Sequence, residues 1–287
     1  MIHPAEMALH QYMEDAAAGK TTMSEATINK VADDIKSALQ RQFGGGNKRD
    51  GFRLRMSNVG RPTCQLWFDK NQPEKALPKP TTFVMNMMLG DIVESVFKAL
   101  LTEAGVSYED NSKVTLKLED DEISGEYDLV IDDAVDDVKS ASDWSYRNKF
   151  ASYETLAQGD SFGYVSQLAG YARAADKKAG GWWVVNKANG EFKYVSASEV
   201  DSDKVIEDIQ ETVNYIEKDE PFERCFKPVP ETFYKKPSGN MVLNSSCRFC
   251  SFKHKCWDSL KTLPSRVSKA KNPPQVDYVL IGDGIAT

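Results

Sequence analysis

The residues best suited to chemistry are two aspartates and a lysine in the middle of the chain. Asp128 stands in the pattern Gly125-x2-Asp128, and the next segment carries Asp137-x-Lys139. Side chains alternate between the two faces of a strand, so Asp137 and Lys139 share one face while Val138 points to the other. If the preceding strand pairs with this one as a hairpin, Asp128 approaches the same face. Two carboxylates can hold a hard divalent cation and an ammonium can position water or offset phosphate charge, so this group suits phosphodiester hydrolysis.

An acid-x-Lys triplet is weak evidence by itself. Three others occur in the chain, at Asp34-Ile35-Lys36, Asp176-Lys177-Lys178 and Glu191-Phe192-Lys193. Such a triplet usually belongs to a solvated, salt-bridged surface. The triplet at Asp137 differs from the others because the segment before it carries an aspartate shortly after a glycine.

Three further polar residues can complete such a site. Glu94 stands at Gly90-x3-Glu94 with apolar flanks, and an acid on the inner side of a helix needs a partner or a metal. Gln167 and Tyr171 are four residues apart and so share a helix face, where they offer neutral hydrogen bonds toward a phosphate or the lysine. Each also has an ordinary interpretation, as an exposed helix acid and as a surface or core-edge pair.

Five cysteines indicate a second kind of site. Three are clustered as Cys247-x2-Cys250-x5-Cys256, Cys64 lies far upstream, and Cys225 is the fifth. Their number is odd and the long chain shows no export signal, so a disulfide framework is not expected. Four thiolates are the usual complement of a 4Fe-4S cluster and also of a structural zinc, and spacing does not choose between the two. His254 and Cys225 stay open as alternative ligands, although for Cys225 a free buried thiol is the simpler interpretation.

A mixed α/β core has to position these residues. Apolar spacing predicts long helices over 82–104, 153–177 and 198–218, and further helical structure within 1–47. Strands are predicted over 113–118, 123–131, 134–140, 182–186 and 192–196, the last two joined by a hairpin at Asn189-Gly190. This order predicts an α/β fold in which a small mixed sheet is flanked by helices.

The ends of the chain have a different character. The segment 221–256 is rich in Pro, Phe and Cys and is expected to be irregular, and the tail that follows is loop-like until a short strand near Tyr278. We therefore expect three parts: an N-terminal helical region at 1–50, a core at 51–260 and a C-terminal tail at 261–287.

Composition excludes several classes of protein. The 287 residues are 41% hydrophobic and 28% charged, which rules out a mostly disordered, collagen-like or mucin-like chain. The apolar stretches are too short for a membrane span and the first residues do not resemble a signal peptide, so an intracellular protein is expected. The net charge of −7 argues against a protein that coats DNA by bulk charge, but a nuclease remains compatible because its metal-binding carboxylates add negative charge.

Basic residues next to aromatic ones suit single-strand binding, by phosphate contact and base stacking. The segment Lys48-Arg49-Asp50-Gly51-Phe52-Arg53-Leu54-Arg55 is one example. Further basic residues stand at Arg147, Lys149, Lys235, Lys236, Arg248, Lys253 and Lys255, and aromatic neighbours at Trp144, Tyr146, Phe249 and Phe252. An ordinary solvated surface is the alternative for each of them.

The order Gly90-x3-Glu94, Gly125-x2-Asp128, Asp137-x-Lys139 and Gln167-x3-Tyr171 resembles the RecB-like branch of the PD-(D/E)XK nuclease superfamily. One cysteine before this series and a C-x2-C-x5-C group after it resemble the nucleases with an iron–sulfur staple, which include CRISPR-associated RecB-like exonucleases and the nuclease domain of AddB. The segment from Ser57 to Trp67 is similar to the one that carries their first cysteine. The resemblance covers about residues 55–260.

The resemblance implies a restriction-endonuclease-like core and a role for each matching residue. Asp128, Asp137 and the Val138 carbonyl would bind Mg²⁺ or Mn²⁺, Lys139 would orient or activate the attacking water, and Gln167 and Tyr171 would hold the nucleic acid or the lysine. The staple would be a 4Fe-4S cluster bound by Cys64, Cys247, Cys250 and Cys256, with structural Zn²⁺ as the alternative. Many relatives carry His where Glu94 stands, so Glu94 would bind metal with a different preference.

The function implied is that of a metal-dependent DNA exonuclease acting on single strands or DNA ends, in recombination, repair or phage DNA metabolism. Such an enzyme would work in the bacterial cytoplasm or in a phage-infected cell, beside a helicase or recombinase partner and away from the membrane. Two alternatives stay open: a non-catalytic nucleic-acid-binding recombination-accessory subunit, and an endonuclease on the same fold.

Overall fold

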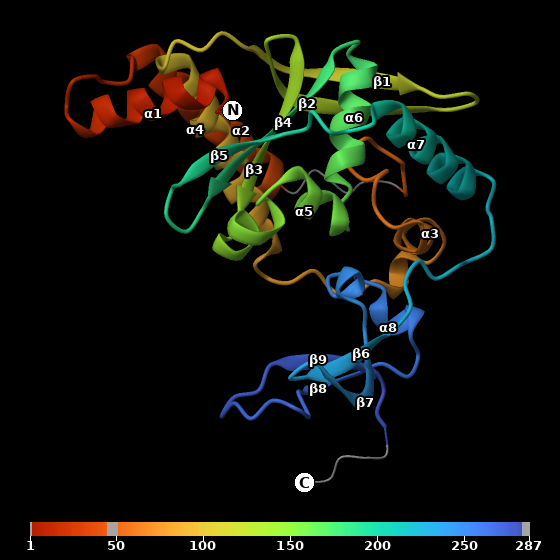
Figure 1. Ribbon diagram of the computed structural model, residues 1–287. Helices are drawn as coiled ribbons and strands as arrows, with labels where there is room; N and C mark the ends of the chain where they lie inside the picture. The colour runs from red at the N-terminus through yellow and green to blue at the C-terminus, as the bar shows by residue number, and fades with distance from the viewer. Residues whose placement is uncertain (1, 45–50, 283–287) are drawn as a thin grey trace. The chain divides into compact units, whose positions relative to one another are not determined.

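A five-stranded mixed sheet organises the larger part of the chain (Figure 1). The computed structural model describes residues 2–44 and 51–282. The strands follow chain order across the sheet; β3 and β4 are parallel and all other neighbours are antiparallel. Their bounds are β1 Glu109–Lys117, β2 Glu122–Ile131, β3 Ala134–Ala141, β4 Lys178–Asn186 and β5 Phe192–Ser196. The parallel pair needs a crossover, which the helices between β3 and β4 supply.

Helices cover both faces of this sheet. On one face α4 (Phe83–Glu103) packs against β3, and on the other α6 (Tyr164–Ala174) packs against β1, β3 and β4. The N-terminal helices α1 (Pro4–Ala17) and α2 (Glu25–Phe43) pack on α4, and Ser24 caps α2. Three further helices accompany this sheet: the π-helix η2 (Ser145–Lys149), α5 (Tyr153–Gln158) and α7 (Ser202–Glu217). None of the helices in the described ranges combines the length and apolar composition needed to cross a bilayer.

The core lies between α4 and the sheet. Alternation along β2 and β3 turns Leu129 and Val138 toward Phe97 of α4, and Trp183 of β4 fills the same layer. Leu9 of α1 closes it from outside. Asp137 and Lys139 consequently face α6, on the side of the sheet opposite to Val138.

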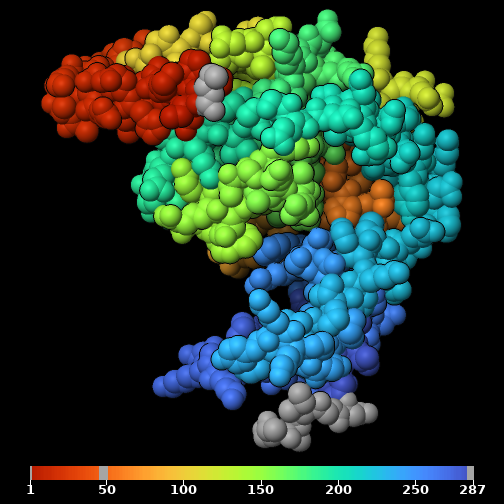
Figure 2. All heavy atoms as spheres, viewed as in Figure 1, coloured from red at the N-terminus to blue at the C-terminus, as the bar shows by residue number. Residues whose placement is uncertain are grey.

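The two acidic turns predicted between the strands are both hairpin turns. Asp132 and Asp133 join β2 to β3 with φ of 49° and 61°, the left-handed pair that a two-residue turn requires. The longer turn after β1 carries four consecutive acids from Glu119 to Glu122, and its yellow tip projects clear of the surrounding surface in Figure 2. The first of these turns matters for function because it brings β2 back alongside β3.

The predicted mixed α/β fold, with a mixed sheet flanked by helices, is confirmed. The predicted single helix over 153–177 is wrong, because α5 ends at Gln158 and α6 begins at Tyr164. The carboxylate of Asp160 accepts hydrogen bonds from the backbone N–H groups of Gly163 and Val165, and Gly163 has a φ of 78°. These two hydrogen bonds to Asp160 and the left-handed Gly163 at the N-cap start a new helix there. Neither feature changes the apolar periodicity from which the helix was predicted.

The chain divides into two compact units: Met1–Gly60 with Pro80–Val213, and Arg61–Lys79 with Asn214–Thr287. The second unit holds the four-stranded antiparallel sheet β6-β7-β9-β8. Its elements are α3 Thr63–Asn71, η1 Pro73–Lys75, β6 Val229–Phe233, β7 Lys236–Val242, η3 Ser245–Cys247, α8 Lys253–Cys256, β8 Lys261–Pro264 and β9 Gln275–Leu280. The predicted division at residues 50 and 260 stays a prediction.

The sheet of the second unit was not predicted, since 221–256 was expected to be irregular. Its interior is polar: buried Glu231 accepts hydrogen bonds from Ser238, Asn240 and Tyr278. The three donors satisfy a carboxylate that would otherwise be costly to bury. Strands built around such a network lack the apolar alternation by which a strand is recognised in a sequence.

Candidate active site

Asp128 and Asp137 meet where β2 and β3 separate. The strand ladder ends at the pair Leu129 and Asp136, and beyond it Asp128 Oδ2 accepts a hydrogen bond of 2.7 Å from the Val138 N–H. The two carboxyl groups are within hydrogen-bonding reach of each other. Burial and then the neighbouring charge of Asp137 raise the pKa of Asp128 to about 7, and burial also raises the pKa of Asp137. Two adjoining buried carboxyls repel each other when both are ionised, and a bound cation would relieve that repulsion.

Lys139 lies against this pair. Its Nζ is 2.5 Å from Asp137 Oδ2 and 3.4 Å from Gln167 Oε1. Burial acts to lower the pKa of Lys139, but the charges of Asp137 and Asp128 outweigh it and hold the pKa above its ordinary value. The ammonium is therefore charged at neutral pH and fixed beside both carboxylates.

Gln167 and Tyr171 stand behind the lysine on α6, as their spacing predicts. Gln167 Nε2 lies 3.4 Å from the Tyr171 hydroxyl, so lysine, amide and phenol form a chain. Gly125 of β2 makes room for the ring: a Cβ there would stand 2.6 Å from both Tyr171 Cε1 and Met56 Cβ. The glycine of the Gly125-x2-Asp128 pattern thus has a packing role.

Glu94 reaches the same region from α4, with a partner that the sequence reasoning missed. Lys98 Nζ lies 2.8 Å from Glu94 Oε1 and 3.0 Å from Asp110 Oδ1, and Lys98 is buried. Burial first and the charge of Asp128 second raise the pKa of Glu94. Glu94 and Asp128 line one cavity of about 380 Å³. The i, i+4 spacing of Glu94 and Lys98 was the sequence signal for this pair.

The acid next to Asp137 belongs to the opposite face. Asp136 is buried and accepts hydrogen bonds from Trp183 Nε1 and the Tyr194 hydroxyl, each at 2.9 Å. Burial raises its pKa to about 7. Its partners are structural, and it is not part of the Asp128 group.

Several residues of the first unit could hold a metal, although their side chains do not converge on one point. Within residues 2–44 and 51–282, no group of three or more His, Cys, Asp or Glu side chains is arranged to bind an ion. Asp128, Asp137 and Glu94 supply carboxylate oxygens in this region, and Asp91, Asp110 and Glu126 line the same cavity as Glu94 and Asp128. Oxygen donors of this kind suit Mg²⁺ or Mn²⁺.

All five cysteines lie in the second unit as free thiols. Cys64, on α3, is buried, and its N–H donates to Cys225 Sγ at 3.1 Å. Hydrogen bonding from Cys64 lowers the pKa of Cys225 to about 6, and that of Cys64 is raised in turn. Cys247, Cys250 and Cys256 lie close enough to Cys225 for their charges to interact. Cys225 is a free thiol, as expected, but the expectation that it is buried is wrong, since the residue is exposed and accepts a hydrogen bond from the Cys64 N–H.

The basic and aromatic residues of the Cys247–Cys256 segment differ in exposure. Phe249 is 75% exposed with the Arg248 guanidinium 5.7 Å from its ring centroid, whereas Phe252 is fully buried and stacks on Phe68. Phe249 is free to stack on a base and Phe252 is not. Lys48, Arg49 and Asp50 of the other predicted segment lie outside the described residues.

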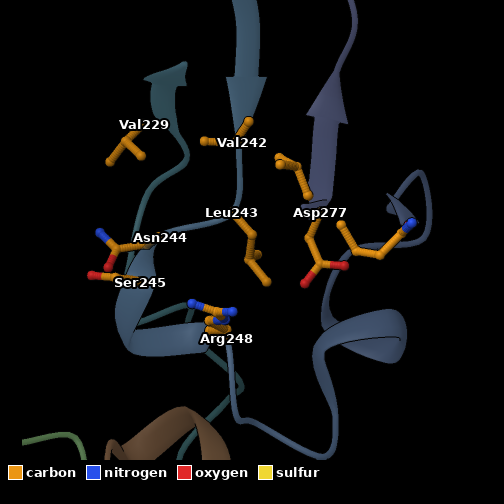
Figure 3. A pocket seen from close by; sticks show the side chains of 9 residues that line it. Val229, Val242, Leu243, Asn244, Ser245, Arg248 and Asp277 are labelled. Atoms are coloured by element: carbon orange, nitrogen blue, oxygen red, sulfur yellow. The ribbon is translucent and has the colours of Figure 1, made fainter. Parts of the chain in front are cut away.

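A second cavity, of about 370 Å³, lies beside Arg248 in the second unit (Figure 3). Val229, Val242 and Leu243 form its apolar wall. Asp277 lies at the other side of the cavity. Its carboxylate accepts hydrogen bonds from Lys253 Nζ at 2.7 Å and from Thr262 Oγ1 at 2.5 Å. With that carboxylate neutralised, Arg248 sets the charge of the cavity.

No protein-family model and no curated protein matches this chain. Among solved structures, one described as "Crystal structure of SSO0001" is similar over 81% of this chain and 96% of its own, with 11% sequence identity and a TM-score of 0.42. A likeness this distant carries no inference about function.

Proposed function

We propose that this protein is a metal-dependent deoxyribonuclease with a PD-(D/E)XK core, an exonuclease that hydrolyses single-stranded DNA or DNA ends. The observation that carries the proposal is the meeting of Asp128, Asp137 and Lys139 at the point where β2 and β3 part, backed by Gln167 and Tyr171. Two adjoining buried carboxyls are costly in a purely structural role. They suit a site that is completed by a divalent cation.

Each residue then has a chemical role. Asp128, Asp137 and the Val138 carbonyl hold Mg²⁺ or Mn²⁺, with Glu94 as a further acid. When bound, the cation polarises the phosphate and acidifies a bound water. Lys139 stays charged beside the carboxylates, where it would orient the attacking water or stabilise negative charge on the phosphate. Gln167 and Tyr171 keep the lysine in place.

We also propose that the cysteines of the second unit bind a 4Fe-4S cluster through Cys64, Cys247, Cys250 and Cys256. Cys64 belongs to one of the two chain segments of this unit and the others to the second, so a shared cluster staples the segments together. Thiolates on a single zinc stand about 3.8 Å apart because each Zn–S bond is about 2.3 Å. Structural zinc bound by the same four thiols is the alternative, and metal analysis of the purified protein distinguishes the two.

The distribution of charge supports a nucleic acid as the substrate. The second unit carries 16 Lys and Arg against 10 Asp and Glu, whereas the first carries 20 against 33. Although the net charge of the chain is −7, the second unit is basic. The same unit carries the exposed aromatic rings of Phe249 and Tyr234. Phosphate contact and stacking on such rings suit single strands. We place the protein in the bacterial cytoplasm or a phage-infected cell, beside a helicase or recombinase.

The test is a nuclease assay on oligonucleotides blocked at the 5′ or 3′ end, with Mg²⁺, Mn²⁺ or EDTA. We expect metal-dependent release of short products from an open end. Asp137→Asn should lower the rate at least about a hundredfold, while Asp136→Asn, its neighbour on the opposite face, should retain metal-dependent cleavage. Internal cuts would identify an endonuclease. Binding without cleavage by the wild type would identify an accessory subunit and overturn the enzymatic proposal.

A further inference from the structure

Lys149 is a buried cation that the proposed chemistry does not use. It ends the π-helix η2, its side chain is only 12% exposed, and Nζ finds no hydrogen-bond acceptor among the residues that the structure describes. The nearest carboxylate oxygen, Asp160 Oδ1, is 3.8 Å away, which is longer than a hydrogen bond. A buried ammonium with unused donors is costly unless an anion reaches it.

The carboxylate of Asp160 already accepts two backbone hydrogen bonds. Its Oδ1 accepts from the Gly163 N–H at 3.0 Å and its Oδ2 from the Val165 N–H at 2.8 Å. These bonds close the turn that separates α5 from α6. The carboxylate therefore holds the backbone, and it offsets the charge of Lys149 only in part.

Aromatic rings connect Lys149 to the catalytic group. Its Nζ lies 4.4 Å from the Tyr164 ring centroid, and Lys139 Nζ lies 4.9 Å from the same centroid. Lys149 Nζ is also 4.7 Å from the ring of Phe162, which stacks on Tyr164 with centroids 5.7 Å apart. Phe162 is 44% exposed, so its ring remains open to a ligand. Burial, together with the charge of Lys139, lowers the pKa of Lys149, and the charge of an added anion would act in the opposite direction.

We propose that Lys149 binds a DNA phosphate next to the one that is cleaved, and that Phe162 stacks on a base of the same single strand. The inference rests on the proposed function. Both lysine ammonium groups lie within 4.9 Å of the same ring centroid, so a strand whose phosphate reaches Lys139 also passes close to Lys149. A stacked pair of rings beside them favours unpaired bases. Lys149 thus determines how a single strand is held, and Lys139 acts at the cleaved bond.

The test measures binding of a labelled single-stranded oligonucleotide to Asp137→Asn protein, which holds the substrate without rapid cleavage, over a series of salt concentrations. Adding Lys149→Gln should weaken binding about tenfold. It should also reduce the slope of log K against log salt by about 0.7, the value for one lost phosphate contact on single strands. Lys149→Arg should restore the slope. Lys193→Gln is the matched control, because Lys193 also lies over a tyrosine ring but donates a satisfied hydrogen bond to the Tyr146 carbonyl.

An unchanged salt slope in folded Lys149→Gln protein would overturn this inference. Lys149→Met, which keeps the apolar stem, serves if the glutamine variant does not fold. Failure of the nuclease proposal looks different, since the unsubstituted protein would then leave oligonucleotides uncut in Mg²⁺ and Mn²⁺ whatever the Lys149 variants do.

Discussion

The ring of Tyr171 occupies the space that a side chain at Gly125 would need, with Cε1 at 2.6 Å from the position of a Cβ. Gly125 and Asp128 lie on the same strand, and Tyr171 holds Gln167, which holds Lys139. The glycine thus sets how closely α6 approaches the carboxylates. A change at Gly125 is transmitted to the lysine through two hydrogen bonds.

Gly125→Ala should therefore displace Tyr171 and reduce both stability and activity. We expect the free energy of unfolding to fall by about 1–3 kcal/mol, the usual cost of overpacking, and cleavage to fall more than stability alone explains. Urea titration and the oligonucleotide assay measure the two effects. Gly90→Ala is the control: nothing lies within 4 Å of a Cβ there, so on α4 it should stabilise by up to about 1 kcal/mol. Equal activity in both variants would disprove the packing role of Gly125.

Asp136 should make stability depend on pH. Its pKa is raised to about 7 by burial, whereas an unfolded aspartate has a pKa of about 3.9. The folded state binds the proton more tightly, so this contribution to stability is complete below about pH 4 and is lost as the pH rises through 7. Relative to Asp136→Asn, which cannot ionise, the wild type should lose up to about 4 kcal/mol over that range.

Urea titrations of the wild type and Asp136→Asn at pH 4.5 and pH 8 check this expectation. Asp120→Asn, in the exposed β1–β2 turn, controls for the loss of a negative charge. The difference between wild type and Asp136→Asn isolates this residue from Asp128, which titrates in both proteins. Parallel pH profiles would show that the Trp183 and Tyr194 hydrogen bonds keep Asp136 ionised in the folded protein.

The candidate active site around Asp128 and Asp137 could be predicted because it depends on the spacing of residues that are close in the sequence. Strand alternation placed Asp137 and Lys139 together, a hairpin brought Asp128 beside them, and helical spacing joined Gln167 to Tyr171. The mixed sheet and most of its flanking helices followed from the same periodicities.

What could not be predicted depends on long-range contacts or on polar groups. The role of Lys98 was not predicted because Lys98 joins Glu94 to Asp110 of β1, and only the folded chain brings Asp110 next to it. The second sheet has a buried glutamate at its centre, where periodicity expects an apolar residue. The approach of Cys225 to Cys64 joins residues 161 positions apart.

The cysteines give a prediction about metal content. Protein purified anaerobically should be brown and contain iron and sulfide, and Cys250→Ser should lose both and unfold more readily. Cys225→Ser should keep its iron, because four thiols remain beside one another. Iron analysis and visible absorption distinguish the variants. Equal iron loss in Cys225→Ser and Cys250→Ser would make Cys225 a ligand, and stoichiometric zinc in a colourless protein would replace the cluster by a structural zinc.

Two phenylalanines three residues apart allow binding to be separated from stability. Phe249 is 75% exposed under Arg248, whereas Phe252 is buried against Phe68. Phe249→Ala should weaken single-strand binding by about 1–3 kcal/mol, the value of one base stacked on a ring, and leave unfolding unchanged. Phe252→Ala should cost about 3–5 kcal/mol of stability because it empties a packed core. Fluorescence anisotropy with a labelled oligonucleotide and urea titration measure the two quantities, and unchanged affinity in folded Phe249→Ala protein would exclude this ring from the DNA-binding surface.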